Sequence, residues 1–376
     1  MNGIGWISEA GEFAKKSLLG KPSRAYVEEA LLEAVQTLIE GRAELDGKRV
    51  DSALVVREDA PGLTAVTLAG LAEAAAGPDA RPCVLLAQDM RTALAIAVNG
   101  DTLAMVMEGQ PELIGVERMV EALNDRGIGP RVWHDGLTET YFAVTDAKSY
   151  AEAFRTLNYA NIVLHQENGV LILDPERTVI EDGVTIGRGT MLYAGNTLQG
   201  TTHIGENCVL YPNNRMQNAV VGDETTVESS VLLDCAVGSH TTVGPYAYLR
   251  PNSNIGSHCR IGDFVEVKNS SIDDGTKVSH LTYVGDSDLG KDINLGCGVV
   301  FVNYDGKAKN RSKVEDHAFI GCNCNLVAPV HIGKNAYLAA GSTVVEDVPE
   351  DALFVARSRG VIKENWVKRR KEAGKL

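Results

Sequence analysis

The feature that most constrains the fold is a six-residue repeat of aliphatic side chains in the second half of the 376-residue chain. The repeat runs from Ile180 to Met216, resumes from Val237 to Val267, and returns from Val314 to Val344. A period of six fits neither an amphipathic helix nor a free strand. It fits a short strand followed by a corner, and three such sides close a coil of about 18 residues. We therefore expect residues 176–350 to form stacked coils with the aliphatic side chains inside.

The cysteines support this arrangement rather than a metal site. Four of them lie two residues before an aliphatic position of the repeat and should share its inward orientation: Cys208, Cys235, Cys259 and Cys324. The close pair Cys322 and Cys324 does not have the spacing of a zinc-binding CxxC motif, and a chain of this size rarely depends on disulfides. We predict no structural metal.

The first half of the chain has a different pattern, which predicts an α/β domain. Apolar runs and their flanking residues indicate helices at Leu31–Ile39 and Leu68–Ala76, and short strands at Ala53–Val56, Val84–Ala87 and Leu103–Val106. Asp146 is a candidate N-cap for a helix of about 20 residues. The predicted organisation is an α/β domain over 1–145, a linking helix over 146–168, the repeat domain over 169–350, and a basic tail over 351–376.

Charge and hydropathy exclude several classes of partner. With 50 acidic and 36 basic residues, the net charge of −14 argues against a protein that coats nucleic acid or an anionic membrane. No apolar run is long enough for a membrane span, and no signal peptide is recognisable, so we expect a cytoplasmic protein. The last twenty residues carry eight Lys or Arg and two Glu. Such a tail is usually solvated, but it could also meet a polyphosphate.

Aligning the coils brings distant residues together. Leu249 and Val267 are 18 residues apart, so the residues after them, Arg250 and Lys268, should share a corner column about 5 Å apart. Like charges stacked in this way repel one another. Two readings are open: the side chains splay into water, or they hold an anion such as phosphate.

The same count predicts two further columns and a protruding loop. Tyr248, Glu266 and Tyr283 should form one outward column on one face of the coils. His280 should begin the same face on the coil that contains Tyr283. His280, Cys297 and Cys322 should form another column. The segment 303–313 interrupts the repeat and must protrude, and such insertions in a solenoid commonly cover a binding site.

Several motifs in the repeat domain resemble one known family. They are Tyr248-Leu-Arg-Pro251, Gly262-Asp-Phe-Val-Glu-Val-Lys268, Ser279-His-Leu-Thr-Tyr-Val-Gly-Asp286, Asn303-Tyr-Asp-Gly306 and Leu338-Ala-Ala-Gly-Ser-Thr343. In this order they closely resemble the acetyltransferase half of the bifunctional N-acetylglucosamine-1-phosphate uridyltransferase/glucosamine-1-phosphate N-acetyltransferase family (GlmU type). The resemblance extends from about Asn161 to Arg359.

The resemblance implies a left-handed parallel β-helix, a homotrimer with active sites between subunits, and acetyl-CoA as the donor for an amino-sugar 1-phosphate, most simply glucosamine-1-phosphate. It implies that His280 is the general base and that Glu266 holds the imidazole. The residues that it assigns to the sugar phosphate are Arg250, Lys268, Tyr283, Asn294 and Lys309. Those that it assigns to the acetyl-CoA site are Cys297, Asn303, Tyr304, Cys322, Ala340 and Arg357. Cys297 and Cys322 depart from the family, which usually has small residues such as Ala and Ser at these positions.

The first 145 residues resemble the uridyltransferase half only faintly, through Leu19-Gly-Lys-Pro22 and Asp59-Ala-Pro-Gly-Leu-Thr64. The Gly-rich loop that cradles nucleotide phosphates is missing, because the corresponding stretch reads Ile7-Ser-Glu-Ala-Gly-Glu-Phe-Ala14. We expect this domain to be a reduced, nucleotidyltransferase-like relic. Two alternatives remain: a bifunctional enzyme that still makes the UDP-sugar with Mg²⁺, or a non-catalytic sugar-phosphate-binding protein.

Overall fold

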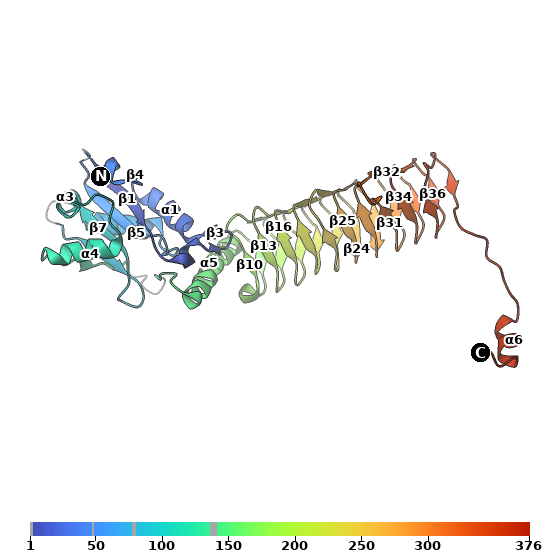
Figure 1. Cartoon of the computed structure of the whole chain (residues 1–376), viewed down its shortest axis with the longest axis horizontal. Coiled ribbons are helices and arrows are strands. Elements are labelled where there is room, and N and C mark those ends of the chain that lie inside the picture. The colour runs from blue at the N-terminus through green and yellow to red at the C-terminus, as the bar shows by residue number, and fades with distance from the viewer. Residues whose placement is uncertain (1–2, 47–48, 77–79, 136–140) are drawn as a thin grey trace. The chain divides into compact units, whose positions relative to one another are not determined.

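The computed structural model describes residues 3–46, 49–76, 80–135 and 141–376. The chain divides into two compact units, one made of Met1–His165 with Ile180–Gly183, and the other of Gln166–Val179 with Val184–Leu376. The predicted fold class is confirmed, because the first unit is α/β and the second is a parallel β-helix of hexapeptide repeats (Figure 1).

The first unit contains a mixed sheet with the strand order β4, β1, β5, β7, β6, β8. The strands are β1 (Gly3–Ser8), β4 (Thr37–Leu38), β5 (Ser52–Arg57), β6 (Cys83–Leu86), β7 (Ala93–Asn99) and β8 (Arg131–Val132). β1 runs parallel to β4 and β5, whereas β7 is antiparallel to β5 and β6. A separate antiparallel pair is formed by β2 (Ser17–Leu18) and β3 (Lys21–Pro22).

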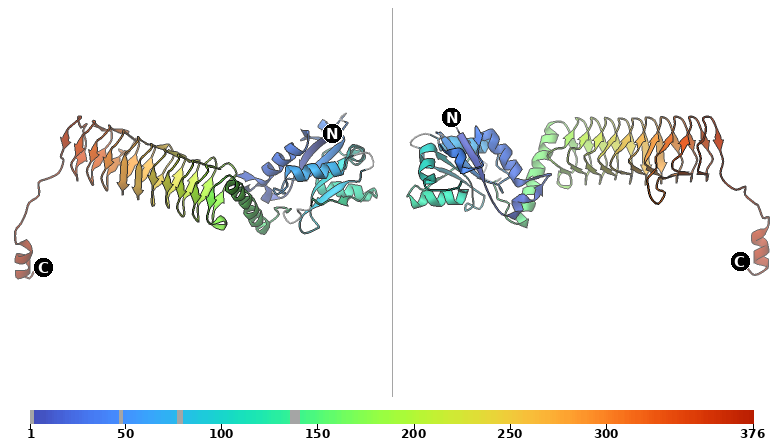
Figure 2. Two further views of the ribbon diagram at one scale, coloured as in Figure 1. Left: turned by 180° about the vertical axis from the view of Figure 1, so that it is seen from behind. Right: turned by 45° about the horizontal axis from the view of Figure 1, so that its top comes forward.

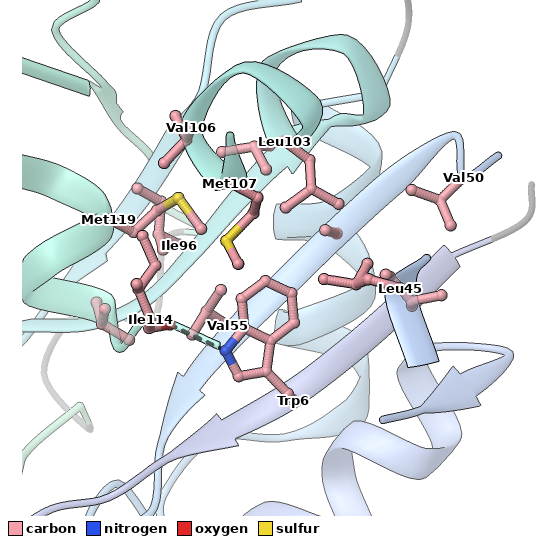
Figure 3. Close-up of a cluster of buried hydrophobic side chains, with 14 of the residues drawn as sticks. Trp6, Leu45, Val50, Val55, Ile96, Leu103, Val106, Met107, Ile114 and Met119 are labelled. Atoms are coloured by element: carbon pink, nitrogen blue, oxygen red, sulfur yellow. Dashed lines mark hydrogen bonds between the residues drawn. The ribbon is translucent and has the colours of Figure 1, made fainter. Parts of the chain in front are cut away.

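Both faces of this sheet are covered by helices. α1 (Ser23–Ala34) and α2 (Ala65–Ala74) pack on one face, and α3 (Gly100–Met107) and α4 (Val116–Asp125) pack on the other. Successive residues of β5 alternate between these two cores, as the period of a strand requires. Trp6 fills the α3/α4 side, where its indole Nε1 donates to the carbonyl of Ile114 at 3.0 Å (Figure 3).

Two sequence-based assignments in this unit are wrong. Leu103–Val106 is helical rather than extended, because the Asn99 side chain accepts a hydrogen bond from the Thr102 N–H at 2.8 Å and starts α3. The helix expected over Leu31–Ile39 ends at Ala34, and the chain continues into β4. The other predicted elements coincide with α2, β5 and β6.

The structure has a helix, α5 (Ala147–Glu167), over the segment 146–168 in which the sequence predicts one. Asp146 accepts a hydrogen bond from the Ser149 N–H at 2.8 Å, which is the geometry of an N-cap. Later in the helix, Asn158 is buried and accepts from the Ile180 N–H at 2.9 Å.

The β-helix places each coil's strands in three parallel sheets, which we name by a central strand. The β28 sheet contains β10 (Val179–Ile180), β13 (Thr197–Gln199), β16 (Arg215–Gln217), β19 (Val231–Leu233), β22 (Tyr248–Leu249), β25 (Glu266–Lys268), β28 (Tyr283–Gly285), β31 (Val300–Val302), β34 (Asn325–Val327) and β37 (Thr343–Val344). The β29 sheet contains β11 (Thr185–Ile186), β14 (His203–Ile204), β17 (Val220–Val221), β20 (Cys235–Val237), β23 (Ser253–Ile255), β26 (Ser271–Ile272), β29 (Ser287–Leu289), β32 (Ser312–Val314) and β35 (His331–Ile332). The β27 sheet contains β9 (Leu171–Ile172), β12 (Met191–Leu192), β15 (Val209–Leu210), β18 (Thr226–Val227), β21 (Thr242–Val243), β24 (Arg260–Asp263), β27 (Lys277–His280), β30 (Asn294–Leu295), β33 (Phe319–Ile320), β36 (Tyr337–Leu338) and β38 (Leu353–Phe354).

The aliphatic positions of the repeat fill the interior of these coils. Ile180, Leu249, Val267 and Val344 have no exposed surface, and the other repeat positions named above are buried as well. The four cysteines predicted to face the core are also buried. The repeat therefore predicts the interior of the β-helix correctly.

One loop and one tail leave the regular coils. The loop lies between β31 and β32, its residues 304–309 are exposed, and Figure 2 shows it projecting from the stack. At the C-terminus, every residue from Val355 onward is exposed, including the short helix α6 (Trp366–Glu372). Within the described ranges, no helix is both long and apolar enough to cross a membrane.

Candidate functional site

His280 lies at the end of β27, where the chain turns the corner between the β27 and β28 sheets. Its coil partner in β24 is Asp263, and the imidazole Nδ1 is 2.5 Å from the Asp263 Oδ1. The hydrogen bond to His280 is the main reason that the pKa of Asp263 is lowered. In a neutral imidazole that donates from Nδ1, Nε2 is the basic nitrogen, so the carboxylate favours the tautomer in which Nε2 can accept a proton.

The expectation that Glu266 holds the imidazole is wrong in this structure. Glu266 lies in β25 opposite Tyr283, on the far side of the corner from His280, and its Oε1 accepts from the Arg250 Nη1 at 2.8 Å. Asp263 is the residue that sequence reasoning missed. The sequence count could have found it. Ile261 and Val278 are coil partners, so Asp263 and His280, each two residues further on, must also be partners.

The column of Tyr248, Glu266 and Tyr283 is confirmed by the strand register. Beside it, Arg250 and Lys268 follow the paired residues Leu249 and Val267, as the count predicted. Their repulsion is reduced by separate carboxylates, because Arg250 pairs with Glu266 and Lys268 lies 3.3 Å from the Asp286 Oδ2.

A third cation comes from the protruding loop. Lys309 lies beside Lys268, and this neighbour is the main reason that the pKa of the Lys309 ammonium is lowered. The positive charge of Arg250 also contributes to that lowering. A lowered ammonium pKa reports an excess of positive potential. We call Arg250, Lys268 and Lys309 the cation cluster.

Asp286 bonds to Lys268 of the cation cluster and to two neighbouring asparagines. It was not singled out from the sequence. Its carboxylate is nearly buried and accepts hydrogen bonds from Lys268, from the Asn269 Nδ2 at 2.6 Å, and from the Asn303 Nδ2. Burial raises the pKa of Asp286, but the bonds from Asn269, Asn303 and Lys268 outweigh it and the net direction is down. The group is therefore an anion that fixes one cation and two amides.

Tyr283 lies against Gly285 in this network. The Asn303 Nδ2 is 3.3 Å from the Tyr283 Oη, and a methyl group placed on Gly285 would lie 2.5 Å from that oxygen. Glycine is required here because the phenol passes directly over the backbone. Tyr304, the next residue of the loop, is exposed and forms an isolated bridge with Lys309.

A second group of predicted residues shares one corner column. Val278, Leu295, Ile320 and Leu338 are successive coil partners, so the residues two positions further on also stack. Those residues are His280, Cys297, Cys322 and Ala340, which we call the His280 column. Arg357 lies beside its far end, because its Cδ is 4.0 Å from the position of a Cβ on Gly341.

Asn294 lies in the β27 sheet, where it pairs with Lys277 on one side and Phe319 on the other. Within the described ranges, no three His, Cys, Asp or Glu side chains are arranged to hold a metal ion.

Comparison with known proteins identifies the repeat domain. The family model described as "Bacterial transferase hexapeptide (six repeats)" matches residues 234–269 and 311–345. The chain is 50% identical over 229 residues to the bifunctional protein GlmU of Clostridium kluyveri, covering 61% of this chain and 50% of that protein. The resemblance to GlmU proteins is confirmed. GlmU of Clostridioides difficile is 46% identical over 250 residues, covering 66% of this chain and 54% of that protein. The chain thus spans about half the length of the GlmU relatives that it matches.

Among solved structures, a UDP-N-acetylglucosamine acyltransferase from Campylobacter jejuni is 16% identical, with a TM-score of 0.28, over 52% of this chain and 82% of that one. At this level the likeness adds nothing to the assignment made from the GlmU sequences.

Proposed function

We propose that this chain is an acetyl-CoA-dependent N-acetyltransferase that acts on an amino-sugar 1-phosphate, most simply glucosamine-1-phosphate, in the synthesis of UDP-N-acetylglucosamine. The observation that carries the proposal is the carboxylate-held imidazole of His280 on the coil that also contributes Tyr283 and lies next to the cation cluster. The GlmU relatives support the choice of reaction.

The cation cluster would bind the phosphate of the sugar. Arg250 can offer two parallel N–H groups to phosphate oxygens, and Lys268 and Lys309 supply compact positive charge. A dianionic phosphate would relieve the repulsion that lowers the pKa of Lys309. Holding the phosphate turns an encounter in solution into an oriented attack by the amine.

His280 would act as the general base. The neutral amine attacks the thioester carbonyl as the His280 Nε2 accepts its proton, while Asp263 stabilises the imidazolium through Nδ1. The tetrahedral intermediate collapses by breaking the carbon–sulfur bond. The departing CoA thiolate takes up a proton, so the products are the N-acetyl sugar phosphate and CoA.

The donor would lie along the His280 column. The outward side chains beyond the base are small, namely Cys297, Cys322 and Ala340, which leaves a path for a slender pantetheine chain. Arg357 stands near the far end of the column, where it could pair with a phosphate of the coenzyme. Asn294, Asn303 and Tyr304 remain proposed contacts to the sugar or the pantetheine.

A homotrimer remains part of this proposal. Tyr246 and Phe264 stack at 5.4 Å on one corner of the β-helix, and both rings are more than half exposed. An exposed aromatic pair on a regular rod favours burial against another copy of the chain.

The N-terminal unit is proposed to be inactive toward nucleotides. In the loop after β1, the buried carboxylate of Glu58 accepts the N–H of Ala10 at 2.8 Å. A carboxylate that already occupies a backbone N–H in this loop opposes the approach of a triphosphate. Mg²⁺-dependent turnover of UTP by the full chain would contradict this part of the proposal.

The experiment that tests the acetyltransferase measures thiol release from acetyl-CoA with a panel of amino sugars and their phosphates. We expect turnover only with an amino-sugar phosphate. Asp263→Asn should lower kcat about 10-fold to 100-fold by removing the support of the base. Glu266→Gln is the matched control, and it should act mainly on the KM for the sugar phosphate through Arg250. A larger kcat effect of Glu266→Gln would restore Glu266 as the imidazole partner.

A further inference from the structure

Cys297 and Cys322 occupy equivalent positions on adjacent coils. Their preceding strands pair through Leu295 and Ile320, and the two corners are joined by a hydrogen bond from the Asn323 N–H to the Cys297 carbonyl at 2.8 Å. Both cysteines are free thiols at the outer corner. The register therefore places two thiols side by side that are 25 residues apart in the sequence.

The spacing of stacked coils is compatible with a disulfide. Hydrogen-bonded neighbouring strands are about 4.8 Å apart, and disulfide-linked Cα atoms are usually separated by about 4.4 to 6.8 Å. The two Cβ atoms must approach somewhat more closely than the coil spacing alone provides. Cys297 can make this adjustment because it lies between Gly296 and Gly298, and Gly298 already adopts a positive φ of 75°.

The remaining cysteines are poorly placed to form a disulfide with either member of this pair. Cys322 is exposed and Cys297 is half-buried, whereas the other cysteines of the chain are buried. Burial raises the pKa of the Cys235 thiol to about 12 and that of Cys259 to about 11, which suppresses the reactive thiolate. Cys324 is the nearest alternative in sequence, but its side chain faces the core.

We propose that Cys297 and Cys322 are a redox modification site that forms a reversible disulfide with a low-molecular-weight disulfide as the oxidant. The exposed Cys322 thiolate attacks one sulfur of the oxidant, forms a mixed disulfide and expels one thiol. Cys297 then attacks the Cys322 sulfur and expels the second thiol. Two protein thiols are oxidised and one small disulfide is reduced to two thiols, so the electrons balance.

We expect this disulfide to regulate the protein rather than to stabilise its fold. A disulfide that must draw two corners together at an exposed position is easily reduced, unlike a buried structural disulfide. It would bridge the two coils that follow His280 in its column and change the surface there. The proposal rests on the register and exposure of the two thiols and holds whether or not the column binds acetyl-CoA.

The test uses the full chain, incubated with glutathione disulfide, blocked with an alkylating reagent and digested with trypsin without reduction. Cleavage after Lys291, Lys307, Lys313 and Lys334 places Cys297 in peptide 292–307 and Cys322 in peptide 314–334. We expect these two peptides to be recovered as one linked species that dithiothreitol separates. Fragmentation at Asn323 should assign the link to Cys322 rather than Cys324.

Two variants and a non-reducing gel distinguish a Cys297–Cys322 disulfide from the other possible products. Cys322→Ser should abolish the linked species, and the matched control Cys324→Ala should leave its yield within about two-fold. A lasting glutathione adduct on Cys322, a link through Cys324, or a dimer on a non-reducing gel would each overturn the proposal. Unreacted thiols after prolonged exposure to the oxidant would do so as well.

Discussion

A single methyl group on Gly285 should disable the proposed sugar-phosphate site without unfolding the protein. The added carbon would lie 2.5 Å from the Tyr283 Oη, 2.6 Å from its Cζ and 2.7 Å from the Asn303 Nδ2. Ordinary contacts begin near 3.5 Å, so the phenol must move by about 1 Å. Tyrosine is rigid beyond its first torsions, so the whole ring must swing and its contact with Asn303 is lost. A misplacement of about 1 Å can cost about 10²-fold in rate.

We therefore expect Gly285→Ala to lower kcat/KM for the sugar phosphate about 10²-fold, which corresponds to about 2.7 kcal/mol. The fold should survive, because the atoms nearest to the new methyl group all belong to side chains, and residue 285 is outside the left-handed region. The assay is initial-rate thiol release with varied sugar phosphate at saturating acetyl-CoA, accompanied by a thermal unfolding curve.

Two controls make this prediction specific. Gly3→Ala adds the same methyl group in the first unit, where its nearest contact is the Ser52 Oγ at an ordinary 3.5 Å, so kinetics and melting should not change. In a Tyr283→Ala background, Gly285→Ala should cause less than about three-fold further loss, because the ring is gone and only the Asn303 Nδ2, which can move into the space that the ring leaves, still meets the new methyl group. Unchanged kinetics for Gly285→Ala, or equal losses with and without Tyr283, would refute the reasoning.

Three further predictions concern the proposed site. His280→Ala should lower kcat by about 10²-fold or more in the thiol-release assay, and an unchanged kcat would remove it as the base. Arg250→Ala and Lys268→Ala should each raise the KM for the sugar phosphate far more than that for acetyl-CoA. The two losses should be non-additive in the double variant. Equal effects on both KM values would indicate that these cations bind the coenzyme instead. Under reducing conditions, CoA should protect Cys297 and Cys322 from alkylation, as mapped by mass spectrometry, and labelling that ignores CoA would exclude them from the donor path.

The β-helix could be predicted almost completely because its geometry leaves few choices. Backbone hydrogen bonds between coils fix their spacing, and buried aliphatic side chains fix which residues point inward. A count along the sequence therefore placed Tyr248 opposite Glu266, and Glu266 opposite Tyr283, as the structure has them.

Side-chain partners were harder to predict than positions. Glu266 can rotate toward Arg250 or away from it, and the sequence does not show which charge it meets. The network around Asp286 depends on an amide that the loop residue Asn303 brings back to the coil. A count of coils predicts where each backbone position lies. Hydrogen bonds across corners and loops depend in addition on side-chain rotamers, which the count does not give.

The first unit was predicted less well because short apolar segments are ambiguous. The run at Leu103–Val106 suits a buried strand as well as a buried helix, and the deciding feature was the cap at Asn99 four residues earlier. The strands β1 and β7 were missed, although β1 is almost wholly buried and lies between β4 and β5 in the sheet.

The tip of the loop between β31 and β32 is closed by contacts within the loop, whereas its two ends are bonded to the coils through Asn303 and Arg311. Asp305 accepts the N–H groups of Lys307 and Ala308 at 2.8 Å, and the Asn310 N–H returns to the Asn303 carbonyl at 2.7 Å. The coil resumes without a slip after it, since Leu289 still pairs with Val314. Doubling the length of such a loop costs only about 0.6 kcal/mol of closure entropy. A loop of another length can therefore stand between β31 and β32 while the coils on either side keep their register.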